Sequence, residues 1–564
     1  MGNNSSCHNS AREPQEFILK SSKDPQLSKK ISIEDFRLGI LGRNTIFDGF
    51  FGTVLSLYLD DCSSARPHKL IEEYIASILP IYANTHSDSS YFAVIMNSMY
   101  NKSKEYILKY FNAPDEYYAL GTGTGMTGAI YHWQEILSNT YPHCFHQSTQ
   151  EKPIVFVSAY EHHSNILTWQ KWGFDIQQID HTGFEDNWEL GLIDLTSKIK
   201  KCFKKPLIII SISACSNITS QIAPLEKIAI LIKKLKNTES ILKSKLLWSI
   251  DLAALSSHKQ INLSILDPDA IFISPHKITG GPGSCGLLIF KKNNYNFNSS
   301  PTKPGGGTVS LVAGLDKKDA IYFNGVDERE SGGTPGILQM IRTALTFQLM
   351  EGVGCENIIK REEELRDKLW FGIAKINSDW EKSKIKNKII ILGSDRRDNR
   401  LTIFSLEIFD EKGELYFYKF MHKLLNDLFG IQLRSGMHCA EPFGFELLHW
   451  DQESIKNLKE LIKSESAKIS EKPGWIRLSL SFSLTDKDLE YILFALKFCS
   501  ENGRQLEKLY QKKIEEKIRE IGKMVKVDLF EGFGVKQVNE EKRNGLMEKR
   551  MSWALKLAEK IKNN

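Results

Sequence analysis

The feature that most constrains this chain is an alternation of short, apolar, β-branched runs with segments of helical periodicity. Each run has the length of a strand, and the segments between them, such as 225–236, repeat apolar residues at helical spacing. Continuous apolar strands separated by helices are typical of a mostly parallel sheet covered on both faces. We therefore expect an α/β fold. The runs are Ile154–Ser158, Leu207–Ser213, Leu246–Ile250, Asp269–Ser274 and Gly286–Phe290.

Polar clusters follow four of these predicted strands. In open α/β sheets, ligands bind outside the carboxyl ends of the strands, so the four clusters predict one shared site. Ordinary turn chemistry explains any single cluster, but it explains all four together poorly. The clusters are Glu161-His162-His163, Ser216-Asn217, Asp251 and Ser274-Pro275-His276-Lys277.

The charge and the cysteine content argue against several classes of protein. The 74 basic and 69 acidic residues leave a formal charge of +5, and the excess lies in the tail after Glu501. Nucleic acid is therefore not an expected partner of the main body. The nine cysteines include no C-x-x-C pair, which argues against a disulfide framework or a metal site and favours the reducing cytoplasm.

The N-terminus matches a lipidation pattern. Met1-Gly2-Asn3-Asn4-Ser5-Ser6 fits the myristoylation signal at Gly2, and Cys7 follows where palmitate can be added. Two acyl chains anchor a protein stably, whereas one binds only marginally. The pattern predicts attachment to a membrane surface through Gly2 and Cys7. A polar leader that matches by chance remains the alternative.

A glycine-rich segment at 121–128 opens a predicted helix. Glycines let the backbone approach a phosphate, and the amides at a helix N-terminus favour its charge. The segment does not match the P-loop motif G-x-x-x-x-G-K-[ST]. It is also not a convincing dinucleotide fingerprint, because no clear strand followed by a distant ribose-binding acid frames it. It predicts a phosphate site without identifying the ligand.

Read in chain order, the motifs resemble the class V aminotransferase family of pyridoxal-phosphate enzymes, and within it the cysteine desulfurase and selenocysteine lyase branch. The resemblance spans residues 57–510 and implies pyridoxal 5'-phosphate as cofactor, fold type I and a homodimer with shared active sites. The motifs are Ala83–Ser87, Glu161–Asn165, Ser216–Asn217, Asp251, Ser274–Lys277, Gly305–Thr308, Arg329–Pro335, Arg434–Ala440 and Gly474–Arg477.

The resemblance implies a role for each residue around the cofactor ring. Lys277 would bond to the aldehyde, and Asp251 would pair with the pyridine nitrogen and keep it protonated, so that the ring withdraws electrons. His162 would stack on the ring and act as an acid or base, with His163 as the alternative. Asn217 would donate to the phenolic oxygen.

The same resemblance implies a phosphate site and a contribution from a second subunit. Thr334 would reach the phosphate of the partner subunit's site. The phosphate ligands within the chain would be Gly125, Met126, Thr127, Ser274 and His276.

Three further residues would act on the substrate. Arg477 would bind the carboxylate of L-cysteine with its guanidinium fork, assisted by Arg434. Cys439 would attack the substrate sulfur and carry it as a persulfide, leaving L-alanine. This step requires a thiolate, which the adjacent His438 would favour.

Three positions depart from the family pattern. Ala254 stands where many desulfurases have glutamine, Ser220 replaces a usual glycine, and Met437 occupies a position that is Cys or His in relatives. These departures weaken the assignment of the substrate. Selenocysteine, an epimerisable amino acid and a cofactor that accepts sulfur stay open as alternatives, as does a non-catalytic, membrane-anchored interaction protein on the same fold.

The expected organisation has four parts. Residues 1–50 form a polar leader, 51–335 the large cofactor-binding domain, 336–500 a smaller α+β domain and 501–564 a basic helical tail. Segment 382–400 is rich in lysine and arginine and is expected to be a surface insertion. The tail is expected to be a solvated helix, with an acceptor of sulfur, an acidic protein or anionic lipid as candidate partners.

Overall fold

The computed structural model describes residues 30–562, except 88, 147–150, 182–186, 465–471 and 525–535. The predicted acylation residues Gly2 and Cys7 lie outside the described residues. No helix in this described part is both long and apolar enough to cross a bilayer.

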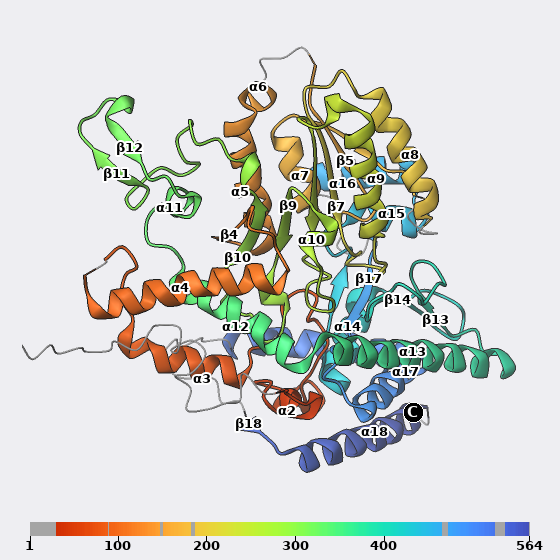
Figure 1. Cartoon of the computed structure of the whole chain (residues 1–564). Coiled ribbons are helices and arrows are strands. Elements are labelled where there is room, and N and C mark those ends of the chain that lie inside the picture. The colour runs from red at the N-terminus through yellow and green to blue at the C-terminus, as the bar shows by residue number, and fades with distance from the viewer. Residues whose placement is uncertain are drawn as a thin grey trace, which may run out of the picture.

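The large domain is built on a seven-stranded sheet in which only β10 runs against its neighbours (Figure 1). This architecture confirms the predicted α/β fold with a mostly parallel sheet. The sequence analysis missed β4 and β6. In spatial order the strands are β4 (Tyr117–Thr122), β10 (Gly286–Lys291), β9 (Ala270–Ile273), β8 (Leu246–Asp251), β7 (Ile208–Ser213), β5 (Ile154–Val157) and β6 (Asp175–Gln178).

Alternating side chains of the strands bury both faces of this sheet. Val155 and Val157 pack with Trp133 of α5 (Gly125–Thr140), whereas Phe156 packs in the cluster that includes α9 (Leu225–Thr238). Because both faces are covered, every residue of β5, β7, β8 and β9 is buried. The other helices on the two faces are α7 (Ser164–Lys171) and α8 (Trp188–Lys201).

Two long helices, α4 (Tyr91–Tyr110) and α12 (Ile337–Val353), lie side by side below the sheet (Figure 1). Tyr110 and Phe347 join them, with ring centroids 4.8 Å apart. Helix α3 (Lys69–Ile78) contacts α12 and buries Ile71, Ile75 and Ile78.

The smaller domain contains a four-stranded antiparallel sheet and three main helices. One expectation is wrong here: 382–400 is not a simple surface insertion, because it includes β13, whose Ile389 is buried in the domain core. The elements are β13 (Lys388–Ile391), β14 (Ile403–Phe409), β17 (Trp475–Ser479), β16 (Arg434–Gly436), α13 (Cys355–Lys382), α14 (Tyr418–Phe429) and α17 (Asp486–Met524).

Both ends of the described chain join the small-domain core. In the tail, β18 (Lys536–Gln537) pairs with β1 (Thr45–Gly49), and α18 (Glu540–Lys562) buries Met547 and Ala554. The expectation of a solvated helix is therefore wrong for α18, because its apolar residues pack against the domain.

The hairpin formed by β11 (Val309–Val312) and β12 (Ala320–Tyr322) projects away from the large domain (Figure 1). Its apolar side chains Leu311, Val312, Leu315 and Ile321 are exposed. The remaining short elements are α2 (Ile33–Leu38), β2 (Gly52–Leu55), β3 (Leu57–Tyr58), α6 (Pro142–Phe145), α10 (Leu263–Leu266), α11 (Val326–Glu330), β15 (Ile431–Gln432), α15 (Glu441–Leu447) and α16 (Gln452–Lys463).

Candidate active site

A cavity of about 230 Å³ lies at the carboxyl ends of the sheet strands, between the two domains. The structure brings together every predicted site residue of the described chain except Thr334. The predicted residues that line the cavity are Gly125, Met126, Thr127, His162, Asn217, Asp251, Ser274, His276, Lys277, Arg434, Cys439 and Arg477.

The glycine-rich segment begins α5 at one end of the cavity. Strand β4 leads directly into it, so the sequence-based statement that no strand precedes this segment is wrong. Gly125 has φ +52°, and a Cβ there would lie 2.7 Å from His276 Cε1 and 2.9 Å from Ser274 Oγ. The Met126 amide donates to Ser274 Oγ at 2.8 Å, and the side chain of the N-cap residue Thr124 makes no hydrogen bond to the helix. The helix start therefore offers amides and a favourable dipole to an anion.

Lys277 ends the short 3₁₀ turn η4 (Pro275–Lys277), which follows β9. Its amide donates to Ser274 O at 3.0 Å, and the Ala65 amide donates to His276 O at 2.9 Å. These bonds fix the backbone on both sides of the lysine, whose side chain lines the cavity.

Asp251, the last residue of β8, is buried at the bottom of the cavity. Its carboxylate accepts from the Ala253 amide at 2.8 Å and from Ser213 Oγ at 3.5 Å. Burial raises the pKa of Asp251 to about 7, and this effect outweighs the opposing influence of the Ala253 hydrogen bond and of Lys277. A cationic ligand nitrogen would stabilise the charged form of this carboxylate.

A second buried acid, Glu161, supports this end of the sheet and was not singled out by the sequence analysis. Its carboxylate accepts from the Ser213 amide and hydroxyl at 2.8 and 2.6 Å, and from Asn165 Nδ2 at 2.7 Å. Burial raises its pKa. Because Ser213 also contacts Asp251, Glu161 positions that carboxylate. Its place directly after β5 was the available signal.

The two histidines after β5 have different surroundings. His162 lines the cavity, and its Nδ1 accepts from the Ser164 amide at 3.2 Å; burial, then Lys277, lower its pKa to about 3. His163 lies outside the cavity, where its ring pairs with Glu441 and its amide donates to Cys439 O at 2.8 Å. His162, and not His163, therefore lines the cavity, and the ring role stays a prediction.

Asn217, after β7, links the cavity to the segment that carries Cys439. Its Nδ2 donates to His438 O at 2.9 Å, and its Oδ1 has no hydrogen-bond partner among the described residues. Its backbone oxygen accepts from Arg477 Nη1 at 3.0 Å.

The two arginines stand on neighbouring strands of the small domain, β16 and β17. Ser63 Oγ accepts from Arg434 Nη1 at 3.0 Å and from Arg477 Nη2 at 2.8 Å. Asp60 also pairs with Arg477 Nη2 at 3.2 Å. Two guanidinium groups facing one cavity provide a site for a carboxylate.

Cys439 lies in the segment between β16 and α15. His438 and Cys439 have φ of +56° and +59°, a conformation that non-glycine residues seldom adopt. Arg434 Nη2 lies 3.9 Å from Cys439 Sγ. Burial, with Arg477 and Arg434 nearby, lowers the pKa of His438 well below its usual value, so His438 is neutral. Arg434, rather than His438, supplies the positive charge beside the thiol.

Two of the departures from the family pattern have a structural basis. Ser220 has φ +60°, the conformation for which glycine is usual. Met437 is buried, and a Cβ at Gly444 would lie 2.5 Å from its Cε, so Met437 fills space under α15. Ala254 lines the cavity and offers no side-chain hydrogen bond.

Thr334 lies outside the cavity of its own chain. Its hydroxyl accepts from Asn84 Nδ2 at 2.9 Å in an exposed setting. The structure describes one chain, so the predicted role of Thr334 in a partner's site stays a prediction.

Comparison with known proteins shows that most of the chain matches one protein family. The model of the family described as aminotransferase class-V matches residues 57–492. A probable cysteine desulfurase from Pyrococcus abyssi (strain GE5 / Orsay) is 24% identical over 391 residues, which cover 68% of this chain and 85% of that protein. A cysteine desulfurase from Wigglesworthia glossinidia brevipalpis is 26% identical over 398 residues, covering 68% and 84%.

Solved structures show the same fold. The apo structure of a cysteine desulfurase from Thermococcus onnurineus NA1 matches with a TM-score of 0.62 and 19% identity, over 83% of this chain and 98% of that one. The cysteine desulfurase CsdA from Escherichia coli matches with a TM-score of 0.55 and 19% identity, over the same shares.

Proposed function

The chain belongs to the class V aminotransferase family, and from this premise we propose that it is a pyridoxal-phosphate-dependent cysteine desulfurase that releases L-alanine from L-cysteine. One observation carries the proposal: Lys277, Asp251 and Cys439 line the same cavity, together with two arginines. The names of the relatives support the choice of cysteine as the substrate.

The donors and charges of the cavity fit the cofactor. The phosphate fits the start of α5, where Thr124 makes no cap bond and Gly125 lets the backbone lie close to Ser274 and His276. The protonated ring nitrogen fits Asp251, whose raised pKa reflects the lack of a strong cationic partner in its buried position. The aldehyde belongs near Lys277. When bound, the cofactor supplies an electron sink for the α-carbon of the amino acid.

The remaining residues act on the amino acid. Arg477, with help from Arg434, would hold the carboxylate, and the Lys277 amine, which lines the same cavity, would take up the α-proton. His162, neutral because burial lowers its pKa to about 3, presents an uncharged ring to the cofactor.

Cys439 accepts the sulfur. Its thiolate attacks the substrate sulfur, so that one S–S bond forms while the substrate Cβ–S bond breaks, and the electron pair of that bond passes to the carbon side. A proton then completes alanine, and the persulfide stays on Cys439. The guanidinium of Arg434 lies 3.9 Å from Sγ, beside the sulfur that takes part in this step.

The enzyme is proposed to work as a homodimer. Thr334, exposed and outside its own cavity, is available to the partner's site. The β11–β12 hairpin exposes Leu311, Val312, Leu315 and Ile321, and a second copy would cover these apolar side chains. Sedimentation of the purified chain tests this state: a monomer at micromolar concentration would contradict it.

The enzyme is proposed to lie at the cytoplasmic face of a membrane, attached through acyl chains on Gly2 and Cys7. A protein is proposed as the acceptor of its sulfur. Support comes from the N-terminal pattern alone. Labelling of cells with alkyne fatty acids should mark the wild type and spare the Gly2→Ala variant, whereas an unlabelled wild type would exclude acylation.

Product analysis tests the activity. The loaded enzyme should convert L-cysteine with a reductant into equal amounts of alanine and sulfide. Cys439→Ala should lose this reaction, and Cys355→Ala, a cysteine outside the cavity, should keep it. A faster reaction with selenocysteine that persists in Cys439→Ala would identify a selenocysteine lyase instead, and loaded protein without any product would favour a non-catalytic role.

A further inference from the structure

A second cavity, of about 40 Å³, lies where the tail helix α18 meets the N-terminal segment and the small domain. It shares no lining residue with the catalytic cavity. Its wall combines three guanidinium groups, from Arg43, Arg66 and Arg543, with several hydroxyl groups. The polar side chains of the wall are those of Arg43, Ser56, Tyr58, Asp61, Arg66, Thr279, Ser481, Ser483 and Arg543.

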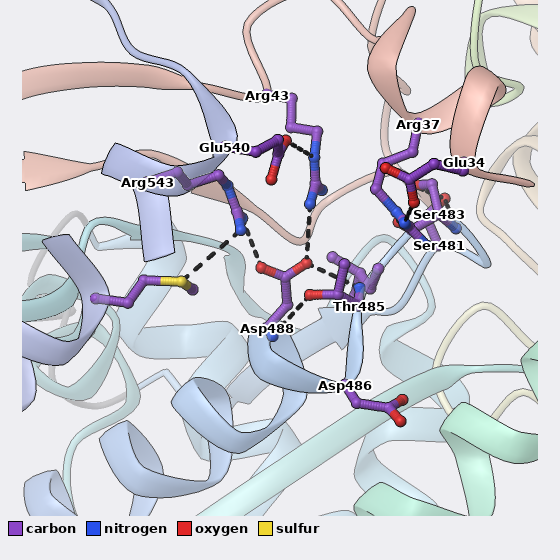
Figure 2. A network of polar contacts seen from close by, with 12 residues as sticks. Glu34, Arg37, Arg43, Ser481, Ser483, Thr485, Asp486, Asp488, Glu540 and Arg543 are labelled. Atoms are coloured by element: carbon purple, nitrogen blue, oxygen red, sulfur yellow. Dashed lines mark hydrogen bonds and ion pairs between the residues drawn. The ribbon is translucent and has the colours of Figure 1, made fainter. Parts of the chain in front are cut away.

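The three arginines come from distant parts of the sequence. Arg43 precedes β1, Arg66 lies between β3 and α3, and Arg543 stands in the first turns of α18. Figure 2 shows Arg43 and Arg543 converging on Asp488 from different segments, with Ser481 and Ser483 nearby. The cavity therefore forms only when both chain ends are docked.

Acidic groups neutralise two of the arginines from outside the cavity wall. Asp488 pairs with Arg543 Nη2 at 2.6 Å and with Arg43 Nη2 at 3.3 Å, and Glu540 pairs with Arg43 Nε at 3.0 Å (Figure 2). Neither acid lines the cavity. These ion pairs hold the two side chains in place beside the cavity.

Within the described chain, one of these arginines has a free donor, and another is held in place by its neighbours. Arg543 is 1% exposed, and its Nε has no hydrogen-bond partner among the described residues. Arg66 donates its Nε to Leu41 O at 3.2 Å and lies over the Tyr58 ring at 5.0 Å. A buried guanidinium with an unused N–H is costly unless a ligand accepts from it.

Asp61 is the one acid of the wall. Burial, reinforced by Asp60, raises the pKa of Asp61 to about 7, so part of its population is neutral at neutral pH. Three guanidinium groups and one carboxylate therefore line the cavity itself, and the two acids that pair with Arg43 and Arg543 stand behind its wall. A single water needs on the order of 10–15 Å³, so this cavity holds a ligand of a few heavy atoms at most.

We propose that this cavity binds one small inorganic anion of about the size of chloride, held by Arg43, Arg66 and Arg543. The anion would accept from guanidinium groups of three separate segments at once. Its binding would therefore stabilise the docking of α18 and of the N-terminal segment on the small domain.

Thermal unfolding of the full chain tests the proposal, with chloride replacing gluconate at constant ionic strength. Gluconate is too large for the cavity. We expect a saturable rise in Tm for the wild type, and a chloride concentration for half of that rise that is at least about tenfold higher in Arg66→Gln. Arg396→Gln, which removes the same charge from an exposed position, should behave as the wild type.

Equal Tm values in chloride and gluconate would overturn the proposal, as would an Arg66→Gln response equal to that of the wild type. A rise with phosphate but not with chloride would also overturn it. Should Arg66→Gln fail to fold, Arg66→Lys and crystals grown in bromide replace it. An anomalous peak among the three guanidinium groups, together with the chloride response, supports the site, whereas a peak without that response means an adventitious ion only.

Discussion

Two parts of the catalytic cavity are built in different ways. The cofactor wall, formed by Gly125, Asp251, Ser274 and Lys277, stands at strand ends or in the turns that directly follow strands. The cysteine loop, residues 437–440, has two consecutive residues with positive φ. Its position depends on side chains and backbone groups from other segments, namely Asn217, His163 and Arg434.

Because the two parts are held in place differently, substitutions in them should have different effects on activity. The buried sheet fixes the cofactor wall, so a change there removes a chemical group without moving its neighbours. The cysteine loop is held by a few long-range contacts, so changes around it shift the position and charge state of one thiol. Substitutions in the wall should therefore abolish the reaction, and substitutions around the loop should reduce it by degrees.

Lys277→Ala tests the wall most severely. Loss of the amine removes both the bond to the cofactor and the base for the α-proton, and we expect desulfuration to fall by at least about 10³-fold. Measurement of alanine release checks this. Lys292→Ala, a lysine outside the cavity, should keep full activity; substantial activity in Lys277→Ala would show that another group performs these steps.

Asp251→Asn should lower the affinity for the cofactor by about 100-fold, because the charged partner of the ring nitrogen is lost. Titration with the cofactor, followed by absorbance, measures this. An unchanged affinity would place the ring nitrogen away from Asp251.

The same substitution should stabilise the cofactor-free protein. The pKa of Asp251 rises from 3.8 to about 7 on folding, so between these pH values the folded chain binds more protons and stability falls as pH rises. Above about pH 7 the carboxylate is charged and its burial lowers the free energy of unfolding by the full amount. Asp251→Asn removes this destabilisation. Its Tm should exceed that of the wild type in this range, and the gain should shrink on acidification.

Arg434→Gln tests the charge beside Cys439. We expect about a tenfold loss of activity with L-cysteine at neutral pH, since the guanidinium that lies 3.9 Å from Cys439 Sγ is lost. Arg434→Lys, which keeps the positive charge, should restore activity in part. Unchanged activity in Arg434→Gln would exclude a contribution of Arg434 to the reaction.

His163→Ala should have the smallest effect, a loss of about threefold in kcat, because the backbone bond from its amide to Cys439 O survives. The ring contact with Glu441 is lost, so Glu441→Gln should reproduce the effect. Loss comparable to that of Lys277→Ala would return His163 to a direct role in the chemistry.

The sequence predicts the cofactor wall well for a physical reason. Buried parallel strands require continuous apolar runs, and the residues that follow those runs are brought to one edge, so Asp251 and Lys277 could be placed without coordinates. β4 was missed because Tyr117–Thr122 mixes aromatic and small residues, and β6 because it is polar and only partly buried.

The cysteine loop and the tail were predicted less well. Neither the positive φ of His438 and Cys439 nor the approach of Arg434 leaves a local pattern in the sequence. The tail packs through Met547 and Ala554 while most of its residues are polar, so its composition indicated solvent exposure. Long-range contacts determine the conformation of the cysteine loop and the packing of the tail. The periodicity of a single sequence does not reveal such contacts.

Mass spectrometry of the loaded enzyme after brief exposure to L-cysteine, without reductant, tests the central claim most directly. The account predicts one added sulfur atom on the peptide that contains Cys439, an equal amount of alanine, and neither product in Lys277→Ala. Alanine formed while Cys439 stays unmodified, or sulfur found on another cysteine alone, would contradict it.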